Sequence, residues 1–155
     1  HGSVDRTVKG SLAYAKGVTY KLNLWSDADL AGSPFTAKSV SGGFLELTDS
    51  LGNSFPIAWG CKKQDCTANH TCEAEAHSMS VWLRGEGIPA QYLLSLVLQS
   101  AIDMDVHEDN AACIIGVAKG YSPAMRYLPR PHKISLSFLH DVTIDVENPH
   151  GRVDV

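Results

Sequence analysis

Apolar and polar side chains alternate in the first part of the chain in a pattern typical of β-strands. Residues 18–24 read Val-Thr-Tyr-Lys-Leu-Asn-Leu and predict a half-buried strand that delivers Asp27 at its end. Residues 42–48 predict a second strand, and a turn-rich stretch then leads into a third strand at residues 54–59. These three segments together predict an antiparallel meander.

After this meander the apolar residues recur at helical spacing. Residues 71–84 predict a helix with Thr71 as its N-cap, ended by Gly85 and Gly87. A second helix is expected at about residues 89–100. The pattern therefore predicts helices that follow the meander.

The last part of the chain contains segments with strand-like and segments with helix-like spacing of apolar residues. Residues 102–106 predict a short strand and residues 111–118 a third helix, whereas residues 133–138 fit a strand and a helix equally well. The order βββαβα, with a terminal helix, predicts an α/β protein with a mixed sheet. We expect one domain over residues 4–155, because residues 1–3 (His-Gly-Ser) have the composition of a tag remnant.

Composition and charge restrict the possible functions only weakly. The 155 residues carry a net charge of −4, so binding to nucleic acid would have to come from a local basic face. The longest apolar run, around residues 88–97, is shorter than the roughly 20 residues that span a bilayer, so no membrane segment is expected. The four cysteines are too few and too unevenly spaced for a disulfide framework, which favours a reducing, intracellular location.

Acidic residues occur at the ends of predicted strands and in the first predicted helix. Asp27 and Asp29 follow the first strand on one face, Glu73 and Glu75 lie in the helix, and Asp109 follows the fourth strand. Strand ends on one edge of a sheet lie close together, and converging carboxylates repel unless a hard cation such as Mg²⁺ joins them. The pattern suggests a two-metal site for phosphoryl chemistry, although acids at such positions also cap helices.

Five ordered motifs carry a resemblance to a known family. They are WSDADLAG at residues 25–32, KSVSGGF at 38–44, IAWGCKKQ at 57–64, EAE at 73–75 and DNAA at 109–112. This series resembles the ribonuclease H domain of copia-type retrotransposon polyproteins, in which the motifs are SDADWAG, KSTSGY, ISWSSKKQ, SSAEAEY and DNQSAI. The similarity covers roughly residues 8–140, nearly the whole chain.

The resemblance implies a ribonuclease H-like fold with a five-stranded mixed sheet, antiparallel in its first three strands. It implies a metal-dependent endonuclease that hydrolyses the RNA strand of RNA/DNA hybrids, with two Mg²⁺ or Mn²⁺ ions. The catalytic metal ligands would be Asp27, Glu75 and Asp109, with Glu75 favoured over Glu73 as the second acid of EAE. A reverse transcriptase domain would precede this one, in a cytoplasmic particle or the nucleus.

One departure from the family weakens the catalytic expectation. The family motif KHID supplies a fourth acid, but Ser135 stands at that position here, and a hydroxyl is a poor ligand for Mg²⁺. A catalytically impaired module with a structural or nucleic-acid-binding role is therefore the alternative. Asp29, Asp141 or Asp145 would be the substitutes for the missing acid.

Further candidate residues are expected around this site. His132 or His107 would assist proton transfer. The expected contacts to nucleic acid are Lys38, Lys62, Lys63, Asn110 and Arg130. Two competing hypotheses are integrase-like strand transfer and a zinc site formed by Cys61, Cys66, His70 and Cys72.

Overall fold

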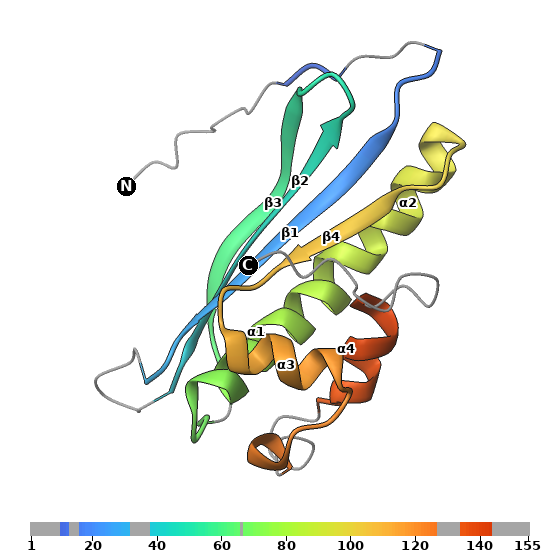
Figure 1. The fold of residues 1–155 in the computed structure, drawn as a ribbon. Helices are drawn as coiled ribbons and strands as arrows, with labels where there is room; N and C mark the ends of the chain where they lie inside the picture. Colours follow the sequence, from blue (N-terminus) through green and yellow to red (C-terminus); the bar gives the residue numbers. More distant parts are fainter. Residues whose placement is uncertain (1–9, 13–15, 32–37, 66, 127–133, 144–155) are drawn as a thin grey trace, which may run out of the picture.

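The computed structural model describes residues 10–12, 16–31, 38–65, 67–126 and 134–143, and forms an α/β protein with one mixed sheet (Figure 1). The strands are β1 (Tyr20–Asp29), β2 (Val40–Asp49), β3 (Ser54–Lys63) and β4 (Asp103–His107). The helices are α1 (Thr71–Trp82), α2 (Ile88–Leu98), α3 (Ala111–Ala118) and α4 (Leu136–Thr143), with a short 3₁₀ turn at Pro123–Met125. Figure 1 shows the helices gathered on one side of the sheet.

The sheet has the strand order β3-β2-β1-β4. Strands β1, β2 and β3 form the expected antiparallel meander, and β4 pairs with β1 in parallel. The parallel pairing ends where Trp25 lies opposite His107, so the last four residues of β1, Ser26 to Asp29, extend beyond the end of β4. This extension leaves one edge of β1 open next to the chain that leaves β4.

The core lies between the sheet and the helices. Leu22 and Leu24 of β1 and Leu45 of β2 are fully buried and pack with Met79 and Leu83 of the helical layer. Their neighbours along each strand point to the other face, as the period of two requires. The alternation of apolar and polar residues therefore predicts the inward face correctly.

The first helix differs from its prediction at both ends. His70, and not Thr71, is the N-cap, and it makes no side-chain capping bond. Gly85 and Gly87 do not end the helix, because a π-helical turn at Leu83–Gly87 joins α1 directly to α2. Gly87 has a packing role instead, since a Cβ there would lie 3.0 Å from Met104 Sδ.

The expectation of a fifth strand is wrong for the described residues, which form a four-stranded sheet. The ambiguous segment 133–138 enters α4 at Leu136, and the Ser135 hydroxyl accepts a hydrogen bond from the N–H of Phe138 at 3.3 Å, as an N-cap does. Lys133 itself lies outside the described residues. Within the described part of the chain, no helix has the length and apolar character needed to cross a bilayer.

Candidate metal centre

Three acids that are far apart in the sequence meet beside the open edge of β1. Asp27 comes from β1, Glu75 from α1, and Asp109 from the segment between β4 and α3. Each offers a carboxylate oxygen, and the three oxygens lie within 4.8 Å of one another. The structure therefore brings together the three acids that the motifs predicted as metal ligands.

The position of Glu75 follows from how α1 is fixed to the sheet. One turn further along the helix, the Ser78 hydroxyl lies 2.8 Å from the carbonyl oxygen of Asp27 and 3.1 Å from that of Gly42. The Gln64 side-chain amide donates to the carbonyl oxygen of Ala74 at 2.9 Å. These hydrogen bonds hold the helix against β1 and β2 and direct Glu75 towards Asp27.

Glu75 is the buried member of the three acids. Its side chain is 3% exposed, and its pKa is raised to about 8, first by burial and then by the negative charges of Glu108, Asp27 and Asp109. One of its oxygens, Oε2, is buried and has no hydrogen-bond partner among the described residues. A buried carboxylate oxygen without a donor is costly unless a cation lies against it.

The donor set fits a hard divalent cation. Three carboxylates within 4.8 Å of one another are oxygen ligands of the kind that Mg²⁺ and Mn²⁺ prefer. Asp27 and Asp109 are exposed, whereas Glu75 is buried, so the cluster is open to solvent on one side. An ion bound there would remain accessible to water on that side.

A fourth acid, Glu108, lies behind this cluster and was not predicted as a site residue. It is 3% exposed, and burial raises its pKa to about 7, against the lowering effect of hydrogen bonds from Asn110 and Ser26. Its two oxygens accept from the Ser26 hydroxyl at 3.3 Å and from the N–H of Asn110 at 3.1 Å. Glu108 thus links the neighbour of Asp27 to the neighbour of Asp109.

The remaining acidic candidates lie outside the three-acid cluster, which is the only such group among the described residues. Glu73 is buried, and its carboxylate accepts a hydrogen bond from the N–H of Asn69 at 2.8 Å, so it serves the start of α1. Asp29 and Asp141 are exposed. Asp145 lies outside the described residues, as do His132 and Arg130.

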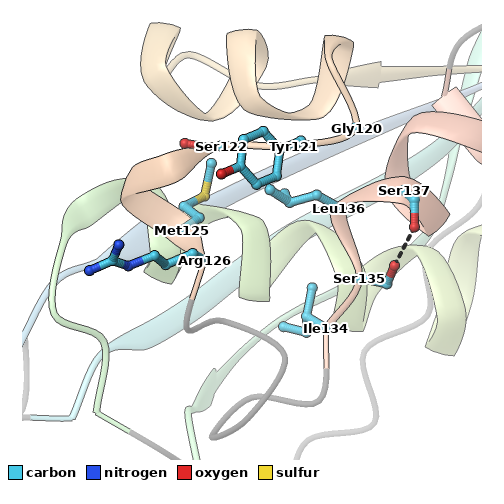
Figure 2. A pocket seen from close by; sticks show the side chains of 9 residues that line it. All are labelled: Gly120, Tyr121, Ser122, Met125, Arg126, Ile134, Ser135, Leu136 and Ser137. Carbon is cyan, nitrogen blue, oxygen red and sulfur yellow. Dashed lines mark hydrogen bonds between the residues drawn. The ribbon is translucent and has the colours of Figure 1, made fainter.

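Ser135 lines a small pocket of about 220 Å³ between the segment after α3 and the start of α4 (Figure 2). Its hydroxyl lies 2.7 Å from that of Ser137, and Figure 2 shows the two hydroxyls pointing towards each other. Together with the hydrogen bond from Phe138, this contact makes Ser135 a capping residue of α4. A hydroxyl engaged in this way is an even poorer substitute for a carboxylate ligand.

Some of the residues predicted to contact nucleic acid are exposed, and others make hydrogen bonds within the protein. Lys62 and Lys63 are exposed at the end of β3, whereas Lys38 is half-buried and donates to the carbonyl oxygen of Asp65. Asn110 caps α3 by accepting from the N–H of Cys113 at 3.0 Å. A role for these residues in binding nucleic acid stays a prediction.

The predicted zinc site gains no support from the geometry. Within the described part of the chain, no set of cysteine and histidine side chains approaches as metal ligands would, and Cys66 lies outside it. His107, a candidate for proton transfer, instead stacks on Trp25 with 4.6 Å between ring centroids, and its Nε2 lies 3.3 Å from Asn23 Oδ1.

Comparisons with protein-family models, curated proteins and solved structures found no match. The function is therefore inferred from the chemistry of the acidic cluster and its surroundings.

Proposed function

We propose that this protein is a metal-dependent endonuclease of the ribonuclease H type, which hydrolyses the RNA strand of RNA/DNA hybrids during retroelement reverse transcription. The observation that carries the proposal is the convergence of Asp27, Glu75 and Asp109, together with the partnerless Oε2 of buried Glu75. Three carboxylates with one orphaned oxygen make a poor structural cluster but a good receptor for divalent cations.

The order of the motifs supports the nuclease over other metal-dependent activities. The four-stranded mixed sheet with flanking helices is compatible with a ribonuclease H-like fold. In this proposal the upstream partner is a reverse transcriptase domain, and the ions are Mg²⁺ or Mn²⁺. The five-stranded form of the fold would need a further strand from residues outside those described.

In the proposed mechanism Asp27, Glu75 and Asp109 would hold the ions, and the exposure of Asp27 and Asp109 leaves one side of the cluster open to the scissile phosphate. Asp27 and Asp109 lie on the exposed side of the cluster, and Glu75 would hold an ion from the buried side. Ions held there would supply Lewis-acid activation of a water and stabilisation of the departing 3′-oxygen. Glu108 keeps Asp27 and Asp109 in register through its hydrogen bonds to their neighbours.

A hybrid-cleavage assay tests the proposal. The wild-type protein should cut the RNA strand of a labelled RNA/DNA hybrid in Mg²⁺ or Mn²⁺ and should leave an RNA-free DNA duplex intact. Asp27→Asn, Glu75→Gln and Asp109→Asn should abolish cleavage, while the matched control Asp103→Asn, an exposed acid at the start of β4, should cut normally. Metal-dependent product at wild-type level from the Asp27→Asn protein would refute the proposed site.

The second candidate function is a catalytically impaired module that binds nucleic acid without cutting it. The observation that favours it is Ser135, whose hydroxyl caps α4 where the family has an acid. Hybrid binding that persists in Mg²⁺ and in Mn²⁺, with no metal-dependent cleavage in either, would establish this second function.

A further inference from the structure

Aromatic side chains form a row across the sheet on the face opposite the helices. Trp25 of β1 lies opposite Phe44 of β2, and Phe44 lies opposite Trp59 of β3. All three side chains are exposed, Trp59 to 60%. The ring centroids of Trp25 and Phe44 are 5.6 Å apart, and His107 of β4 continues the row by stacking on Trp25. We call Trp25, Phe44 and Trp59 the aromatic row.

An open groove of about 430 Å³ follows this row and reaches the acidic cluster. Besides the aromatic row it is lined by Asp27 and Cys61 and by glycines on β2 and β3. Gly42 lies between Asp27 and Cys61 in the sheet register and carries no side chain, which leaves the groove open beside Asp27. Asp27 therefore belongs both to the groove and to the candidate metal centre.

The groove floor is held from the helix side. Trp82 of α1 packs so closely under Gly43 that a Cβ on this residue would lie 2.0 Å from the indole ring. Glycine at this position lets the ring lie directly against the strand backbone, and the same ring extends under Gly60. A floor supported in this way keeps the exposed rings at fixed positions, which lowers the entropic cost of binding a planar ligand.

The chemistry of the groove favours the bases of an unpaired nucleic-acid strand. Exposed aromatic rings on neighbouring strands of an open sheet provide stacking surfaces for two or three bases. Lys63, exposed at the end of β3 two residues beyond Cys61 on the same face of the strand, can pair with a phosphate.

We propose that this groove binds a single-stranded nucleic-acid segment, with bases stacked on Trp25, Phe44 and Trp59 beside the acidic cluster. The inference rests on the proposed function only for the position of this segment next to a cleavage site. Binding itself needs no metal and no cleavage, so the two proposals can fail separately.

Fluorescence anisotropy of a labelled single-stranded oligothymidylate, measured in EDTA, tests the inference. Trp59→Ala and Phe44→Ala should each weaken binding about tenfold, as the loss of one stacked base implies. Trp59→Phe should restore most of the affinity because it restores a ring. Tyr92→Ala is the matched control, since this exposed aromatic residue lies on α2 outside the row, and it should bind as the wild type does. Circular dichroism of each variant checks that it is folded.

Three outcomes would overturn the inference. One is absence of wild-type binding, and another is an equal loss of affinity in the Tyr92→Ala protein. The third is a wild-type dimer that Trp59→Ala converts to a monomer in light scattering, because a second copy would then occupy the groove. If the protein cleaves the hybrid but fails the binding test, the proposed function stands and the binding inference fails. If it binds the single strand but does not cleave, the binding inference stands and the proposed function fails.

Discussion

The metal-free protein should lose stability as the pH rises from 5 to 8. Glu75 is buried beside Glu108, Asp27 and Asp109, and its pKa is raised from 4.5 to about 8. Because this folded-state pKa lies above the ordinary value, folding favours the protonated carboxyl. The corresponding stability is fully present below about pH 4.5 and is lost progressively as the pH rises through 8.

The size of the effect follows from the shift. Each unit of pKa corresponds to about 1.4 kcal/mol, so the change between pH 5 and pH 8 is about 3 kcal/mol for Glu75 alone. Glu108, with a pKa raised to about 7, adds to it in the same direction. For a domain of this length, 3 kcal/mol corresponds to roughly 10 °C in Tm, which thermal denaturation resolves easily.

The perturbation that isolates this effect is Glu75→Gln. Thermal and urea denaturation in EDTA at pH 5, 6, 7 and 8 should show a flatter pH dependence than the wild type and a higher stability at pH 8. Glu73→Gln is the matched control, because Glu73 is equally buried in the same helix but outside the acidic cluster, and it should keep the wild-type slope. A wild-type stability that rises between pH 5 and pH 8, or the same slope in the Glu75→Gln protein, would refute the reasoning.

Three further predictions concern the same region. Mn²⁺ should raise the Tm of the wild type more at pH 8 than at pH 5, because ligation needs deprotonated carboxylates, and Asp109→Asn should remove this gain in differential scanning fluorimetry. Glu108→Ala should weaken Mn²⁺ binding in calorimetry by roughly tenfold although all three proposed ligands remain, because it removes the hydrogen bonds from Ser26 and Asn110. An unchanged affinity would show that Glu108 does not position the ligands. Ser135→Ala should cost about 1 kcal/mol in urea denaturation through loss of the α4 cap, whereas Ser135→Asp should keep the cap, and equal stability of the two variants would contradict the capping role.

The sheet was predictable because its signal is local. Alternation identified the first three strands and their buried face, and the third helix was predicted at the observed bounds of Ala111–Ala118. The glycines at 85 and 87 misled the prediction because glycine ends helices but also permits close packing. Gly87 is needed for close packing and does not end the helix, because Met104 and Leu24 lie where its side chain would be.

The three converging acids could be predicted, but Glu108 was missed although the sequence carries a signal for it. Val106 is buried in β4, and Glu108 follows it by two residues, so the alternation directs both side chains inward. An acid at an inward position needs partners, and these come from Ser26 and from the Asn110 backbone, which only the tertiary structure places. The fifth strand was implied by the family resemblance alone, whereas the ambiguous segment 133–138 leads into α4, with Ser135 accepting from the N–H of Phe138.

The acidic cluster opposes folding, so other interactions must hold it together. Burial and mutual repulsion raise the pKa values of Glu75 and Glu108, which means that the ionised forms destabilise the metal-free fold. The opposing contacts are the Ser78 and Gln64 hydrogen bonds that fix α1 to the sheet, supported by the apolar core below. A purely structural cluster would not need such an arrangement, because neutral residues at these positions would be more stable. Ionisation of the site therefore opposes folding in the absence of a cation, and a bound divalent ion that neutralises these charges would couple metal binding to the stability of the fold.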